Sequence, residues 1–223
     1  MIDSSTAADE VLAPSFLSAK SRLVLASGSS ARQALLRESR VDFTVRTADI
    51  DENEYKQAGR EKGQDASQVA LCLAEAKAGT VAATVGDPDA WVIGADQMLT
   101  CQGAGGSEWF DKPSSRQGAR AQLLRLRGKT HHLHSAVVLW WQGRVMWTHL
   151  AQPALTMRSF SEQFLDAYLE SEGEACLGCV GSYRLEGTGI QLFQRIEGDH
   201  SAILGLPLLP LLNALRDFGV LAK

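Results

Sequence analysis

The chain has 223 residues, of which 45% are apolar and 22% are charged, with 22 Lys and Arg against 26 Asp and Glu. This composition is typical of a soluble globular protein and excludes a collagen, a coiled coil and a wholly disordered chain. Because the formal net charge is −4, the surface has no general excess of cations for wrapping a nucleic acid. A local cluster of cations is still enough to bind a small anion.

The sequence also bears on the compartment of the protein. No run approaches the roughly 18 to 20 uninterrupted apolar residues that a membrane-spanning helix needs. The first residues include Asp3, Asp9 and Glu10 and lack the basic start of a signal peptide, and four cysteines make no disulfide framework. We therefore expect a cytoplasmic protein that binds no membrane, with residues 1–20 as a flexible extension and residues 21–223 as one domain.

The first patterned segment predicts a strand, a loop and a helix. The β-type run 23–26 is followed by the loop 27–30, and the apolar spacing of residues 31–36 is helical. Such a junction aims backbone N–H groups and the positive end of the helix dipole at the space above the loop, which is a common way to hold phosphate. Taken alone, the pattern favours the alternative, a serine that caps a purely structural helix.

Further strands and helices follow, separated by turns rich in glycine, proline and aspartate. We expect an acidic tip at residues 49–52 and an antiparallel hairpin that turns at residues 142–143. The predicted strands are 41–47, 91–96, 131–140, 144–158 and 190–196, and the predicted helices are 64–82, 116–126, 161–171 and 207–218. The total is a mixed α/β fold with two lobes around a central cleft.

Several charged residues lie at the ends of these elements. They are the carboxylates Asp49, Asp51, Glu52 and Asp96 and the cations Arg32, Lys77 and Lys112. Carboxylate oxygens bind Mg²⁺ or Mn²⁺, cations bind phosphate oxygens, and a spare carboxylate can activate water. Asp96 is the strongest candidate, because a carboxylate that ends an apolar strand is costly to bury unless it is hydrated, paired or metal-bound. A solvated helix lysine at Lys77, a loop acid at Glu52 and a turn at Lys112 remain the structural alternatives.

The order of these segments resembles the Maf family of nucleotide pyrophosphatases. The similar blocks are residues 25–36, 49–52, 73–78, 92–97 and 112–113, followed by a closing region at 175–189, 193–201 and 204–208. The resemblance covers about residues 21 to 218, nearly the whole chain. It implies an elongated two-lobed α/β fold similar to the inosine triphosphate pyrophosphatases, and cleavage of a nucleoside triphosphate to the monophosphate and pyrophosphate.

The resemblance also implies roles for single residues. Asp96 would be the general base or a metal-linked carboxylate, and Glu52 a ligand of Mg²⁺ or Mn²⁺. Lys77 and Lys112 would be catalytic cations, and Ser27, Ser29 and Arg32 would bind the substrate. These roles suit the chemistry, because the attacking water must be aimed and deprotonated while the leaving pyrophosphate develops negative charge. A homodimer is implied as well, with no residues identified for its interface.

Two positions bear on the base of the nucleotide. Family members with Thr at the position of residue 97 and Gln at that of residue 186 are associated with thymidine and uridine triphosphates. A second subgroup, with Gln and Glu at these positions, is associated with 7-methylguanosine triphosphate. This chain has Gln97 and Glu186. A carboxylate accepts two hydrogen bonds from N1–H and the exocyclic amine of guanine, whereas uracil offers one donor. We therefore expect a guanine-type or modified purine, although Ala31 stands where the family commonly has an Arg or a Trp that could stack on the base.

Other interpretations stay open. Cys176 and Cys179 form one C-x-x-C pair, which supplies only two of the four ligands of a structural zinc site. His132 and His134 share one strand face opposite His131, a pattern that favours an exposed polar edge over a metal site. A regulatory nucleotide-binding protein linked to septum formation and division arrest is the rival class. A nucleic-acid module is disfavoured by the charge balance and by the lack of an aromatic and basic stripe.

Overall fold

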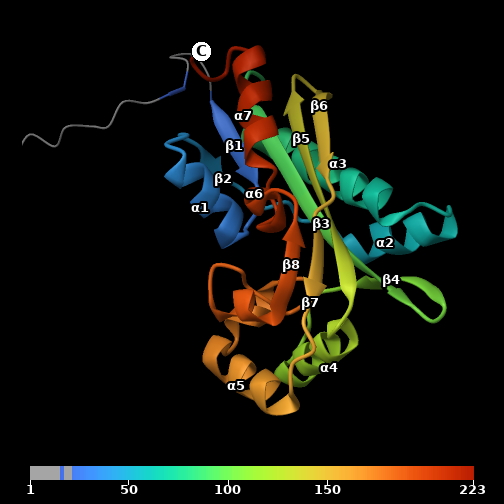
Figure 1. Ribbon diagram of the computed structural model, residues 1–223. Helices are drawn as coiled ribbons and strands as arrows, with labels where there is room; N and C mark the ends of the chain where they lie inside the picture. The colour runs from blue at the N-terminus through green and yellow to red at the C-terminus, as the bar shows by residue number, and fades with distance from the viewer. Residues whose placement is uncertain (1–15, 18–21) are drawn as a thin grey trace, which may run out of the picture.

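A single mixed sheet organises the computed structural model, which describes residues 16–17 and 22–223 (Figure 1). Within these residues, eight strands run in the order β2-β1-β3-β5-β7-β8, while β4 pairs with β3 and β6 pairs with β5. The strands are β1 (Leu23–Ala26), β2 (Thr44–Val45), β3 (Trp91–Gly103), β4 (Gly106–Phe110), β5 (Thr130–Trp141), β6 (Arg144–Ala151), β7 (Ala154–Met157) and β8 (Phe193–Glu197). Strand β1 is parallel to β2 and β3, and the other pairings are antiparallel, so the predicted mixed α/β class is confirmed.

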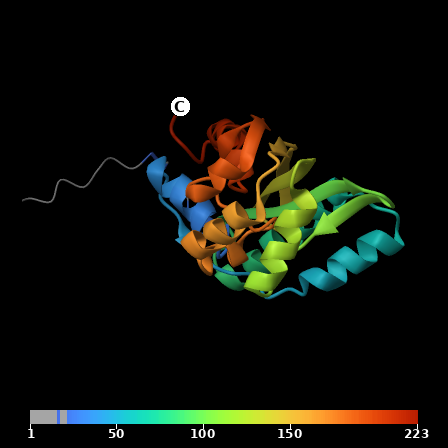
Figure 2. The same ribbon diagram turned by 60° about the horizontal axis from the view of Figure 1, so that its bottom comes forward.

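Helices cover the sheet in two lobes that share the long strands β3 and β5. They are α1 (Ser30–Glu38), α2 (Glu52–Glu61), α3 (Ala66–Val85), α4 (Arg116–Leu126), α5 (Glu162–Glu172), α6 (His200–Ile203) and α7 (Leu208–Asp217), with 3-10 turns at Ala175–Gly178 and Thr188–Leu192. In the first lobe, α3 and α7 pack on opposite faces of the sheet, each over its own apolar cluster. In the second lobe, α4 and α5 bury a third cluster, and they come forward in Figure 2.

Helix α3 lies unusually close to strand β3. Its sheet-facing positions include the buried alanines Ala70, Ala74 and Ala78, which leave little side-chain volume between helix and sheet. Opposite them stands Gly94, where a Cβ atom would come within 2.0 Å of the carbonyl oxygen of Ala74. A side chain larger than hydrogen therefore has no room at this position, and the close approach fixes where the rest of α3 lies relative to the end of β3.

The structure differs from the sequence prediction in the segment after β2. The expected acidic tip at residues 49–52 is loop over residues 49–51, but a helix that was not predicted, α2, begins at Glu52. Asp51 is the N-cap residue, and its carboxylate accepts hydrogen bonds from the backbone N–H groups of Asn53 and Glu54. Carboxylates in this position and in the first turn stabilise a helix by satisfying free N–H groups and complementing its dipole. The helix is polar on almost all sides, and so its sequence lacks the apolar stripe that would predict a helix.

Three further boundaries differ. The predicted strand 91–96 continues as β3 to Gly103, so Asp96 lies within the strand and not at its end. The predicted strand 144–158 is split into β6 and β7 at Pro153, which has no N–H group to donate to a neighbouring strand. Strand β8 begins at Phe193 rather than at residue 190, because a 3-10 turn occupies the residues before it. The short helix α6 was not predicted, and Asp199 caps it through the backbone N–H of Ala202.

The predicted extension, residues 1–20, lies outside the described residues except for Phe16 and Leu17. Leu17 forms an antiparallel bridge with Leu221, and the carbonyl oxygen of Phe16 accepts a hydrogen bond of 2.9 Å from the N–H of Ala222. These contacts join residues 16–17 to the C-terminal segment. In the part of the chain that the structure describes, no helix combines the length and the hydrophobicity needed to cross a membrane.

Replacing Gly94 should displace α3. Because a Cβ atom at this position meets a backbone oxygen rather than a flexible side chain, Gly94→Ala is expected to lower the free energy of unfolding by about 1 to 3 kcal/mol. Urea unfolding followed by circular dichroism measures this. Gly105→Ala is the matched control, since nothing lies within 4 Å of a Cβ atom there. Equal stability of the two variants would contradict the close packing described here.

Candidate active site

A pocket of about 720 Å³ lies between the two lobes. Its walls come from the loop between β1 and α1, the start of α2, the middle of α3, the middle of β3, the loop before α4, and the segment 178–186. All of the predicted site residues line it, namely Ser27, Ser29, Arg32, Glu52, Lys77, Asp96, Gln97, Lys112 and Glu186. Residues that are up to 159 positions apart in sequence, from Ser27 to Glu186, therefore share one cavity.

The loop 27–30 and Arg32 form one wall of the pocket. The Ser27 hydroxyl is buried and accepts hydrogen bonds from Arg32 Nη1 at 3.0 Å and from the Ser29 N–H at 3.3 Å. Ser29 caps α1, because its Oγ accepts from the backbone N–H of Arg32 at 3.4 Å. The predicted serine cap is therefore present, and the same helix N-terminus opens on the pocket.

Two backbone carbonyl groups hold the Arg32 guanidinium in place. Its Nε donates to the Gly205 oxygen at 2.7 Å and its Nη1 donates to the Ala95 oxygen at 3.1 Å. Burial lowers the pKa of Arg32, while the nearby Asp96 and Glu52 carboxylates act in the opposite direction. Among the described residues, Nη2 has no hydrogen-bond partner, so the guanidinium retains donor capacity for an anion in the pocket.

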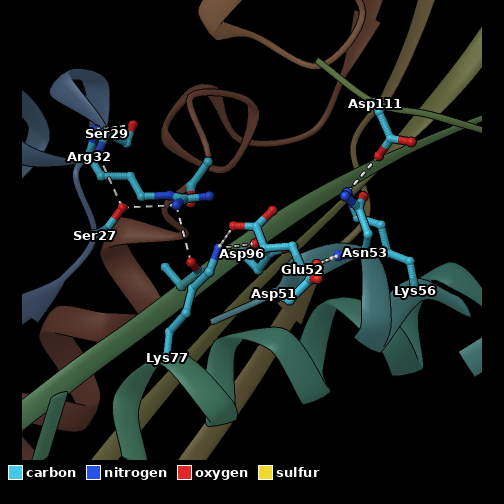
Figure 3. Close-up of polar contacts among 12 residues, drawn as sticks. Ser27, Ser29, Arg32, Asp51, Glu52, Asn53, Lys56, Lys77, Asp96 and Asp111 are labelled. Carbon is cyan, nitrogen blue, oxygen red and sulfur yellow. Dashed lines mark hydrogen bonds and ion pairs between the residues drawn. The ribbon is translucent and has the colours of Figure 1, made fainter. Parts of the chain in front are cut away.

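Lys77 joins the two carboxylates that the sequence analysis selected. Its Nζ lies 2.6 Å from Asp96 Oδ1 and 2.6 Å from Glu52 Oε1, so that α3, β3 and α2 meet at one ammonium group (Figure 3). The Asp96 side chain is only 7% exposed, while Glu52 is more accessible. The interpretation of Lys77 as a solvated helix lysine is therefore wrong.

The Glu52 carboxylate lies among several ammonium groups. Burial acts to raise its pKa, but Lys77, and at longer range Lys56 and Lys112, together hold the pKa below its usual value. The group is consequently an anion across the neutral range. An anionic carboxylate beside Asp96 is the donor type that a hard divalent cation prefers.

Lys56 and Asp111 are pocket residues that the sequence analysis missed. Lys56 lies one helical turn after Glu52 on α2, and its Nζ lies 2.5 Å from Asp111 Oδ1 in the loop that carries Lys112. A spacing of four residues places Glu52 and Lys56 on the same face only if the segment is helical, and α2 was not predicted. That spacing is the signal that could have identified Lys56.

The two predicted base-recognition residues, Gln97 on β3 and Glu186 in the segment 178–186, both line the pocket. The Gln97 amide nitrogen donates to Ser135 Oγ at 2.8 Å and to the carbonyl oxygens of Ala202 and Ile203 at 3.1 and 3.0 Å. Glu186 is exposed, and its Oε1 accepts from Arg184 Nε at 3.2 Å. The sequence analysis did not select Arg184, which also lines the pocket.

Buried contacts fix the loop that carries Glu186. The Glu172 side chain, 5% exposed, accepts hydrogen bonds from the backbone N–H and the hydroxyl of Thr188 and pairs with Arg184 at 3.3 Å. Tyr183 donates to or accepts from the buried His131 ring at 2.8 Å. The loop is thus anchored on both sides of Glu186, which limits the positions that this carboxylate can take.

The histidine and cysteine motifs form no metal centre in the described chain, where no cluster of three or more His, Cys, Asp or Glu residues has suitable geometry. His131 and His132 face opposite sides, as predicted, but only His132 is exposed. His134 is bonded to Ser67 Oγ at 2.8 Å and Thr100 Oγ1 at 2.9 Å, and so the prediction of an exposed polar edge is wrong for it. Burial lowers the pKa of His131 to about 3, which keeps the ring neutral.

A helix N-terminus, several cations and two carboxylates that share one lysine are groups suited to binding and hydrolysing a phosphate compound, here in an α/β fold. Residues 22–218 match the family model described as Maf-like protein, and the chain belongs to this family.

Curated relatives cover almost the same length. A protein of Paramagnetospirillum magneticum named nucleoside triphosphate pyrophosphatase is 52% identical over 89% of this chain and 99% of its own length. One of the same name from Granulibacter bethesdensis is 50% identical over 88% and 96%. A 7-methyl-GTP pyrophosphatase of Mesorhizobium japonicum is 44% identical over 90% and 98%. Among solved structures, a HAM1 protein from Coxiella burnetii is similar with a TM-score of 0.38 and 16% identity, over 61% of this chain and 73% of the other.

Proposed function

We propose that the protein is a nucleoside triphosphate pyrophosphatase that works with a divalent metal ion and prefers a guanine-type or modified purine nucleotide. The contact that carries the proposal is the Lys77 ammonium group held at 2.6 Å from both Asp96 and Glu52 in a pocket that Arg32 and Lys112 also line. The names of the curated relatives support the reaction. Cytoplasmic localisation and a homodimer stay predictions from the sequence.

The donor atoms fit Mg²⁺ or Mn²⁺ that arrives together with the substrate. Proteins that act on nucleotides hold Mg²⁺ through one or two carboxylates, and phosphate oxygens and water complete its shell. Glu52 and Asp96 supply two such carboxylates, and Glu52 is the more exposed of the two. When bound, the ion would neutralise charge on the phosphate oxygens and so favour attack and departure.

The residues of the chain would divide the remaining tasks. The α1 N-terminus, Arg32 and Lys112 bind and orient the phosphate chain, because each presents N–H donors to the pocket. The Asp96 carboxylate accepts a proton from the water that attacks the α-phosphorus. Lys77 contacts that carboxylate and is placed to stabilise the negative charge that develops on the leaving pyrophosphate.

Glu186 supports the preference for guanine. Arg184 occupies Oε1 of Glu186 from one side, and the exposed carboxylate retains acceptor capacity for N1–H and the exocyclic amine of a guanine. Gln97 keeps its amide nitrogen bonded to α6, at the carbonyl oxygens of Ala202 and Ile203. Because Gln97 also lines the pocket, its amide oxygen can contribute one further acceptor.

Asp96→Asn separates the enzyme from the regulatory alternative. We expect this substitution to lower kcat for pyrophosphate release by about 10²- to 10⁴-fold, because an amide cannot accept the proton. Nucleotide binding, measured by isothermal titration calorimetry, should remain detectable. Asp42→Asn is the matched control, since Asp42 is exposed and lies outside the pocket.

Two results would reject the catalytic role. An unchanged rate in Asp96→Asn would show that this carboxylate is not the base. A wild-type protein that binds nucleoside triphosphates with Mg²⁺ or Mn²⁺ but releases no pyrophosphate would favour the regulatory nucleotide-binding protein.

The base preference is tested with 7-methyl-GTP, GTP, dTTP and UTP. We expect higher kcat/KM for the guanine-type nucleotides, and Glu186→Gln should reduce their advantage over UTP by about 10- to 100-fold, the value of a hydrogen bond to a charged group. Glu170→Gln, an exposed change outside the pocket, serves as the control. A wild-type preference for dTTP or UTP would refute the role of Glu186.

A further inference from the structure

Lys56 is a cation of the pocket to which the proposed reaction assigns no role. It extends from α2, one turn after Glu52, and its side chain is 14% exposed (Figure 3). Its Nζ lies 2.5 Å from Asp111 Oδ1. Both residues line the same cavity as Lys77 and Lys112, so this ion pair belongs to the wall of the pocket rather than to the outer surface.

Three ammonium groups from three different elements surround the Glu52 carboxylate. Lys77 touches it directly, while Lys56 and Lys112 act on it through space. Since Glu52 is a proposed metal ligand, a metal-bound phosphate chain beside it lies within the same electrostatic reach of Lys56. A lysine is well suited to this contact, because its ammonium group is mobile on a long side chain and donates in several directions.

The partner of Lys56 is easily released. Asp111 is 53% exposed, in contrast to Asp96 at 7%. An ion pair with a solvent-exposed carboxylate contributes little to stability, since water can solvate the carboxylate when the cation leaves. A phosphate chain that carries several negative charges therefore competes well with Asp111 for the ammonium group. The pocket lining contains five Lys and Arg against four Asp and Glu, so a paired cation that changes partners would add to the binding strength of the cations that are not paired with a carboxylate.

We propose that Lys56 is a further phosphate-binding residue of this site, held by Asp111 in the free protein and transferred to the phosphate chain when the nucleotide binds. This inference rests on the proposed function, which places a triphosphate in the pocket. Asp111 then holds the ammonium group at the pocket wall in the free protein and competes with the substrate for it.

The two partners should respond in opposite ways to substitution. Lys56→Gln removes the cation, and KM for the nucleoside triphosphate should rise about 10- to 100-fold, as expected for loss of one hydrogen bond from a charged group, with a smaller change in kcat. Asp111→Asn frees Lys56 from its competitor, and KM should be equal to or below the wild-type value. Lys62→Gln, an exposed change at the end of the same helix, should leave both constants unchanged.

Binding of inorganic tripolyphosphate, measured by isothermal titration calorimetry, tests the contact without any turnover. Lys56→Gln should weaken this binding by the same factor as it raises KM, and thermal unfolding of each variant confirms that it is folded. A wild-type affinity and a wild-type KM in Lys56→Gln would overturn the inference. Equal losses in Lys56→Gln and Asp111→Asn would also overturn it, because they would mean that the ion pair is only a structural clamp.

Failure of the proposed function gives a different result. If the wild-type protein released no pyrophosphate while Lys56→Gln still weakened tripolyphosphate binding, the reaction would be wrong and the phosphate contact of Lys56 would stand. If the wild-type protein turned over nucleotides and Lys56→Gln behaved like it in both assays, only the inference about Lys56 would fail.

Discussion

The ion pairs of Lys77 with Asp96 and Glu52 join helix α3 to strand β3 and helix α2, which are separate in the sequence. The rest of the site is arranged around these ion pairs. They depend on the direct packing of α3 on β3, because the helix must lie against the sheet for the Lys77 ammonium to reach Asp96 in the middle of the strand. Gly94 provides the necessary space. A backbone feature with no chemistry of its own thus determines whether the charged groups of the pocket can meet.

The charges of the pocket explain how an acidic protein can be equipped for an anionic ligand. The net charge of −4 describes the whole surface, whereas the cavity has nearly balanced charges that are held in pairs. Arg32 differs from the paired cations, since backbone carbonyls rather than carboxylates hold it. Pairing keeps the buried groups stable in the free protein. Because some partners are exposed, as Asp111 is, the cations remain available to a phosphate chain.

Part of this arrangement was predictable from local sequence. Asp96 stands out as a carboxylate that follows an apolar run, although β3 continues past it to Gly103. The loop with Ser27 stands out because a strand precedes it and a helix follows. Helix α2 was not predictable in the same way, because its polar sequence lacks an apolar stripe and its cap at Asp51 resembles the turn of an acidic loop. Because this helix was not predicted, Lys56 was not identified as a site residue. The hydrogen bond from Arg32 to the Gly205 carbonyl could not be predicted either, since the two residues are 173 positions apart and only the folded sheet brings them together.

The central claim is that the cavity between the Ser27 loop and Asp96 holds a metal-bound triphosphate. A crystal structure with Mn²⁺ and a nucleotide whose α,β-bridging oxygen is replaced by a methylene group tests it most directly. We predict an anomalous manganese signal between the carboxylates of Glu52 and Asp96, with phosphate oxygens in its shell. Phosphate groups outside this cavity, or manganese bound away from both carboxylates, would contradict the account.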